Sequence, residues 1–199
     1  MNLLTHLYLA GLSPRLVVGS LLPDLAKTQE LTSLSGEIMS GITRHREIDV
    51  FADQNPIFSC SKHRLGDEFR RYNGILTDVF YGYFLVLEWQ RFSAMPMQQF
   101  VSYVHDAFDE CRDELPPLIY DRLVRLRNSN RLCANADIDG VRVTLELIGS
   151  WLRKPVALGD AVGKLTENYP DLKCDFLKFF PEMIDFVVSG RRSLVPLEI

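Results

Sequence analysis

The sequence of 199 residues has few cysteines and no close pair of them. A disulfide framework or a thiolate zinc site needs cysteines at short, regular spacings. The chain has four, none of them in a C-x-x-C pair: Cys60, Cys111, Cys133 and Cys174. The sequence therefore argues against both, and predicts reduced thiols.

Long apolar runs and a basic leader are also missing. The longest apolar stretches, such as residues 16–22 and 84–87, are far shorter than the ~20 residues that a membrane-spanning helix needs. The first residues carry no basic region, and their apolar run is interrupted by His6 and followed by Pro14, unlike a signal peptide. We expect a soluble, cytoplasmic chain with no membrane partner.

Excess positive charge is absent, since the formal net charge is -4. Proteins that bind the phosphate backbone normally present a basic surface, so we expect no nucleic-acid partner. The 47% hydrophobic and 24% charged residues are those of an ordinary globular protein. The length predicts a single domain over residues 1–199. Nothing in the sequence indicates its oligomeric state.

Apolar residues recur with helical period, and no alternating strand pattern or hairpin signal is present, so the fold class is all-α. Asn2 is a candidate cap for a first helix, and Ser13-Pro14 is a cap followed by proline at the first helical position. The second helix is expected to run toward Leu22. Pro23 should end it and leave Asp24 on a turn.

The later helices follow from the same pattern. We expect a basic helix over about residues 58–72, after the break at Asn55-Pro56, and another over about residues 75–92, after Asn73-Gly74. The C-terminal helix contains Pro181, which should kink or divide it.

Four ionisable side chains interrupt apolar stripes: His6, His45, Asp49 and Asp78. Burying any of them alone is costly, so each needs a partner. His45 and Asp49 are four residues apart on a helix and point the same way, as two ligands of one metal ion would. The alternative is a hydrogen-bonded pair that only positions helices.

Three segments carry a resemblance to a known family. They are the opening Met1–Ala10, the run Gly19-Ser20-Leu21-Leu22-Pro23-Asp24, and Gly41-Ile42-x-x-His45-Arg46-x-Ile48-Asp49-x-Phe51-x-Asp53. Together with Gly74-Ile75-x-x-Asp78-Val79-Phe80-Tyr81, they resemble the acyl carrier protein phosphodiesterases over almost the whole chain. That family is considered related to HD-type phosphohydrolases, so the resemblance implies a compact helical bundle of that kind.

The resemblance implies an enzyme that hydrolyses the phosphodiester of holo acyl carrier protein, its partner, and releases 4'-phosphopantetheine. It also implies a divalent cation, manganese first, with magnesium or another metal as the alternative. By matching position, the metal ligands would be His6, Asp24, His45, Asp49 and Asp78. Of these, His6, His45 and Asp49 would also serve the catalytic step. A hard cation accepts carboxylate oxygen and imidazole nitrogen and makes a bound water nucleophilic.

Arginines near this segment suit an anionic substrate. Arg44 or Arg46 could steady the phosphate, because a guanidinium pairs with phosphate oxygens. Carrier protein is acidic, so Arg44, Arg46, Arg64 and Arg70 could also attract it. The alternative for each arginine is an exposed, solubilising charge.

One departure concerns Gly82-Tyr83, where the family has an aspartate-histidine pair. Residue 82 lies four residues beyond Asp78, on the same helix face. The glycine indicates either space for a ligand or a weakened site. Two further hypotheses therefore stay open: hydrolysis of another small phosphodiester or nucleotide, and a non-catalytic relative that binds carrier protein without cleaving it.

Overall fold

The computed structural model describes residues 1–32, 34, 36–129 and 131–194. Within these ranges the regular elements are all helices and no strand occurs, which confirms the all-α class. The α-helices are α1 (Leu3–Ala10), α2 (Pro14–Leu25), α3 (Gly36–Gln54), α4 (Pro56–Arg64), α5 (Asn73–Leu87), α6 (Trp89–Phe92), α7 (Met97–Glu110), α8 (Pro117–Asn128), α9 (Ile138–Trp151), α10 (Val162–Glu167) and α11 (Tyr169–Leu194). Short 3₁₀ segments are η1 (Thr28–Leu31), η2 (Arg70–Tyr72), η3 (Arg112–Glu114), η4 (Arg131–Ala136) and η5 (Leu158–Ala161).

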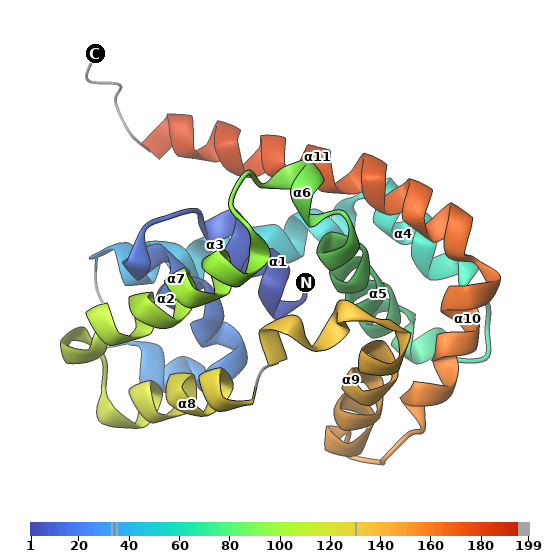
Figure 1. Ribbon diagram of the computed structural model, residues 1–199, viewed down its shortest axis with the longest axis horizontal. Helices are drawn as coiled ribbons and strands as arrows, with labels where there is room; N and C mark the ends of the chain where they lie inside the picture. The colour runs from blue at the N-terminus through green and yellow to red at the C-terminus, as the bar shows by residue number, and fades with distance from the viewer. Residues whose placement is uncertain (33, 35, 130, 195–199) are drawn as a thin grey trace.

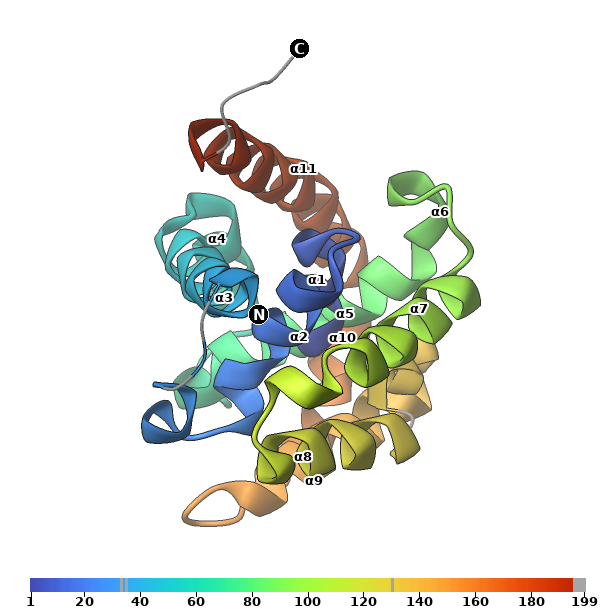
Figure 2. The ribbon, with the colours of Figure 1, turned by 90° about the vertical axis from the view of Figure 1, so that its left-hand side faces the viewer.

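The helices surround one cluster of buried apolar side chains. In Figure 1, α11 runs along one side of the molecule, α7 and α8 lie at one end, and α9 and α10 lie at the other. Figures 1 and 2 both place the first residue in the middle of the bundle, and α1 contacts α2, α3 and α5 there. None of the helices in the described ranges combines the length and the apolarity needed to cross a membrane.

The predicted caps are confirmed. The Asn2 side chain accepts a hydrogen bond from the Thr5 amide, and the Ser13 hydroxyl accepts one from the Leu16 amide. Asn55 accepts bonds from the first amides of α4, which begins at Pro56. Each cap satisfies amides that a helix start leaves without a partner.

Three predicted helix boundaries are wrong. Pro23 does not end α2, which continues to Leu25, so Asp24 lies in the last helical turn rather than on a turn outside it. The basic helix expected over residues 58–72 ends at Arg64, and Gly66 follows with a φ of 72°, a conformation that glycine adopts easily. The helix expected over residues 75–92 is two helices, α5 and α6.

The long helix α11 passes through Pro181 without dividing. A buried polar network anchors it to α4 and α5. The Ser61 hydroxyl donates to Asp175 at 2.9 Å and lies 2.8 Å from the Tyr81 hydroxyl, while Arg64 Nε donates to Asp175 at 2.8 Å. Aromatic rings such as Phe179 pack against Tyr81 beside this network. Its polar atoms are therefore paired inside the core, as buried polar groups need to be.

Helices α2 and α3 cross where Gly19 meets Gly41. A Cβ atom on Gly41 would lie only 2.9 Å from Gly19 Cα and 2.6 Å from the carbonyl oxygen of Leu16. Both neighbours are backbone atoms, which cannot rotate away. The two glycines therefore permit an approach that larger residues would prevent, and this crossing positions the site described next.

Candidate metal centre

The two histidines and Asp49 meet inside the bundle. His6 from α1, and His45 and Asp49 from α3, place ligand atoms within 4.8 Å of one another. His6 Nε2 lies 3.3 Å from Asp49 Oδ1, and His45 Nε2 lies 3.2 Å from Asp49 Oδ2. The imidazole rings stack, with centroids 3.7 Å apart. Asp49 therefore faces both imidazoles at once.

The other two predicted ligands border this cluster. Asp24, at the end of α2, has Oδ1 3.9 Å from His45 Nε2. Asp78, on α5, has Oδ1 3.9 Å from the ammonium group of Met1, which in turn lies 2.6 Å from Asp49 Oδ1. The fold thus gathers side chains that are up to 72 positions apart in the sequence into one site.

The close crossing of α2 and α3 orients His45. Its Nδ1 lies 2.7 Å from the carbonyl oxygen of Ser20, the residue after Gly19. A carbonyl can only accept, so Nδ1 donates its proton to Ser20, and Nε2 faces Asp49, to which it donates a hydrogen bond when the ring is protonated and beside which it offers a lone pair when the ring is neutral. Metal-binding histidines are commonly oriented in this way by a partner on the other nitrogen.

Asn2 ties the start of α1 to α5. Its side-chain oxygen caps α1, and its Nδ2 donates to the carbonyl oxygen of Asp78 at 3.1 Å. His6 lies one turn beyond this cap, so the two bonds of Asn2 fix the distance between His6 and Asp78. The capping residue recognised in the sequence is also a positioning residue.

Burial and charge give these groups distinct proton affinities. Burial lowers the pKa of His6 to about 4, so its ring is neutral at pH 7. Burial opposes charge on His45 too, but Asp49 and the Ser20 carbonyl outweigh it and raise that pKa. Burial alone would raise the pKa of Asp49, but the imidazoles and the Met1 ammonium hold it well below its usual range.

The remaining carboxylates bind protons more readily. Burial raises the pKa of Asp78 to about 6, against the effect of the Met1 ammonium, and burial also raises the pKa of Asp24. Desolvation disfavours the ionised form of a carboxyl group unless a cation stays close.

The residues present fit a divalent cation. Both ring nitrogens of His6 and Oδ1 of Asp78 are buried and, within the described part of the chain, have no hydrogen-bond partner. Acceptor atoms of His45 and Asp49 point at the same region. Unpaired buried acceptors are costly, and a cation satisfies several of them together. The ammonium of Met1 against Asp49 shows that this position favours positive charge.

A cavity of about 560 Å³ opens beside the cluster. Asp24, Asp78 and Gly82 all line it. A Cβ atom on Gly82 would meet the Asn2 side chain at 2.7 Å and that of Asn135 at 3.2 Å. The glycine therefore provides room for two amide side chains at the cavity wall.

The sequence profile of the acyl carrier protein phosphodiesterase family matches residues 1–183. The chain belongs to this family. It is 30% identical over 195 residues to the acyl carrier protein phosphodiesterases of Escherichia coli strains Crooks and K12 DH10B, and 29% identical to that of strain O45:K1. Each alignment covers 98% of this chain and all of the relative. No solved structure matches the chain.

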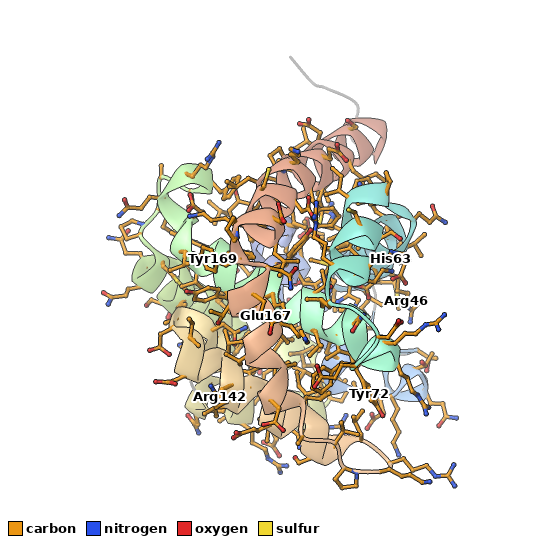
Figure 3. All side chains as sticks on the ribbon, turned by 90° about the vertical axis from the view of Figure 1, so that its right-hand side faces the viewer. Arg46, His63, Tyr72, Arg142, Glu167 and Tyr169 are labelled. Atoms are coloured by element: carbon orange, nitrogen blue, oxygen red, sulfur yellow. The ribbon has the colours of Figure 1, made fainter. Side chains whose placement is uncertain are left out.

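The family's aspartate-histidine pair has no structural counterpart here. Gly82 faces the cavity, but Tyr83 is buried on another side of α5, with its ring 6.4 Å from that of Tyr169 at the start of α11 (Figure 3). A histidine at position 83 would therefore be directed away from His6 and His45. The cluster assembles without a carboxylate at position 82.

The predicted arginines lie apart from the cluster. Arg44 donates to the Ala10 carbonyl, and Arg64 pairs with Asp175. Arg46 and Arg70 are exposed, and Arg46 lies at the edge of the face shown in Figure 3. Two positive groups near the cluster, the Met1 ammonium and Arg131, could not be predicted from the sequence, because no local pattern marks a contact made across the fold.

Proposed function

We propose that this member of the family hydrolyses the phosphodiester that joins 4'-phosphopantetheine to a serine of holo acyl carrier protein. Water would add to phosphorus, the bond from phosphorus to the serine oxygen would break, and that oxygen would take a proton. The products are the free arm, as a phosphate monoester, and the apo carrier protein. Family membership supports the substrate, and the acceptor cluster beside a cavity supports the chemistry.

The observation that carries the proposal is the convergence of two imidazoles and the Asp49 carboxylate within 4.8 Å, next to His6 nitrogens and an Asp78 oxygen that are buried and have no hydrogen-bond partner among the described residues. We assign His6, His45 and Asp49, bordered by Asp24 and Asp78, to a divalent cation, with manganese as the first candidate. Such a cation polarises a phosphoryl oxygen and lowers the pKa of bound water when it is present.

The chain's own groups have separate tasks in this proposal. His6 offers a neutral nitrogen, His45 offers Nε2 once the proton on it has left, and Asp49 supplies the negative charge between them. Asp78, with its pKa at about 6, can take up and release a proton near neutral pH, as a group that assists proton transfer must. The burial of both histidines limits competing hydrogen bonds from bulk water to their ring nitrogens.

The test is incubation of the purified protein with holo carrier protein and manganese, with mass spectrometry of the carrier protein. We expect loss of the phosphopantetheine mass, suppression by a chelator, and at least a hundredfold slower loss with Asp49→Asn. Glu47→Gln, an exposed change on the same helix, is the control and should retain the wild-type rate. Intact holo carrier protein after prolonged incubation with manganese and with magnesium would refute the proposal.

A further inference from the structure

The cavity beside the cluster is larger than a phosphodiester group needs. Its volume of about 560 Å³ falls within the ~300–1,000 Å³ typical of pockets for small organic ligands. Its wall includes Asp24 and Asp78 together with residues of η4 and α9. The cavity therefore has room for an extended group attached to a phosphate at the cluster.

The charge of Arg131 interacts with that of Asp24, but the two side chains do not form an ion pair. Its half-buried side chain has no hydrogen bond or ion pair with any residue in the described ranges, and its guanidinium lies 4.9 Å from the ring centre of Trp151. A partly buried guanidinium gains much from a charged acceptor, and phosphate matches its planar set of donors. Arg131 therefore indicates an anionic ligand in the cavity near Asp24.

Amide side chains follow along the wall. Asn135 has a backbone φ of -90° and ψ of 34°, which interrupts η4, and its Oδ1 accepts a hydrogen bond from Thr144 at 2.8 Å. Its Nδ2 is directed toward Gly82, beside the Asn2 amide. Donors of this kind suit the carbonyl groups of a ligand that contains amide bonds.

An apolar stripe forms the outer wall. Val143, Leu147 and Trp151 are spaced four residues apart on α9, so they share one face of the helix. They are 61%, 38% and 58% exposed, although residues of this kind are usually covered. All three line the cavity, so this face is part of the same concave surface as Arg131.

We propose that this cavity holds the pantetheine arm of the substrate, with Arg131 on its phosphate and the Val143–Leu147–Trp151 face along its alkyl and amide chain. The inference rests on the proposed function and specifies how that substrate is bound. The kinds of group in the wall match the kinds of group in the arm: Arg131 suits an anionic phosphate, and the amide and apolar side chains suit a chain that alternates amide and alkyl units. The bound arm would thereby bury the exposed apolar side chains of α9.

The test is calorimetric titration of the protein with three probes: free 4'-phosphopantetheine, pantetheine and adenosine 5'-monophosphate. Arg131→Gln should weaken phosphopantetheine binding roughly tenfold, the loss of one charge-assisted pair, and leave pantetheine binding unchanged. Leu147→Gln should weaken both. Arg125→Gln and Leu118→Gln, exposed changes on α8, are the matched controls and should alter neither. Circular dichroism verifies that each variant is folded.

Three results would overturn the proposal: no binding of phosphopantetheine, binding that Arg131→Gln and Leu147→Gln leave unaffected, or tighter binding of the adenosine nucleotide through the same two residues. The last would assign the cavity to nucleotides. Turnover of holo carrier protein is measured separately. If the protein turns over holo carrier protein but neither variant changes phosphopantetheine binding, only the arm cavity is refuted. If the variants change binding as expected but the protein does not turn over holo carrier protein, only the proposed hydrolysis is refuted.

Discussion

A methyl group at Gly82 should disturb the centre without touching any proposed ligand. The Cβ atom of Gly82→Ala would lie 2.7 Å from Nδ2 and 2.9 Å from Cγ of Asn2, distances that require the Asn2 side chain to move. That side chain caps α1 and donates to the Asp78 carbonyl. The substitution therefore acts on two bonds that hold α1 against α5.

The expected free-energy change follows from these contacts. Replacing a helical glycine by alanine ordinarily stabilises a protein by about 1 kcal/mol. Loss of the Asn2 cap costs about 1 kcal/mol, and loss of its hydrogen bond to α5 costs about 1 kcal/mol more. Gly82→Ala should thus destabilise the protein by about 1 kcal/mol rather than stabilise it. Gly190→Ala, in α11 with open space around the Cβ position, is the control and should stabilise it.

Urea unfolding of the metal-free variants measures these changes, and titration with manganese measures the site. We expect weaker manganese binding for Gly82→Ala, because a displaced Asn2 shifts His6 away from Asp78. A Gly82→Ala variant as stable as Gly190→Ala, with wild-type manganese affinity, would show that the Asn2 bonds do not set the site.

The double change Gly82→Asp with Tyr83→His tests whether the family's pair would improve this site. The added carboxylate meets the same crowded amide groups, and the imidazole replaces a ring packed against Tyr169. We expect lower turnover of holo carrier protein in a variant that circular dichroism shows to be folded. Increased turnover would instead support a site weakened by the loss of that pair.

The other predictions concern metal, surface charge and pH. His45→Ala or Asp49→Ala should reduce manganese affinity in calorimetry far more than they reduce folding stability, and unchanged affinity would remove both from the ligand set. Arg46→Glu with Arg70→Glu should slow association with acidic carrier protein at low salt and have less effect at high salt, because salt screens exposed charges. Equal association rates for this variant and the wild type at low salt would exclude Arg46 and Arg70 from carrier-protein binding. Since burial lowers the pKa of His6 from 6.5 to about 4, protons on this ring favour the unfolded state in that window, and His6 alone should cost the metal-free protein up to about 3 kcal/mol as pH falls from 6.5 to 4, an effect that the raised pKa of Asp78 offsets over much of the same range. His6→Gln should lack this component when unfolding is compared across the same pH range.

Local sequence signals predicted the helices and part of the site. Caps depend on residues three positions apart, and the shared face of His45 and Asp49 depends on four, so both can be read from spacing. The end of α2 could not be predicted from the sequence, because the proline at position 23 does not show that the helix continues to Leu25 in the folded protein. Local propensity is a weak guide where packing opposes it.

Sequence also did not predict which arginines are paired within the protein. Arg64 stands in a basic stretch that resembles an exposed surface, but its guanidinium pairs with Asp175, which is 111 positions later in the sequence. Arg131 stands in no motif and lies in the wall of the proposed substrate cavity. Whether an arginine is paired on its own chain or left for a ligand depends on these long-range contacts, which composition and spacing do not contain.

The motif glycines connect the sequence pattern to the chemistry of the centre. In the sequence, Gly19 lies five residues before Asp24, and Gly41 lies four residues before His45. Neither glycine has a side chain that could bind the metal. In the fold, Gly19 and Gly41 are the crossing point of α2 and α3, and the Ser20 carbonyl beside that crossing accepts the Nδ1 proton of His45. A wider crossing would lengthen that bond and free the ring to turn its nitrogens. The glycines therefore belong to the same functional unit as Asp24, His45 and Asp49, because they determine which nitrogen of His45 faces the cluster.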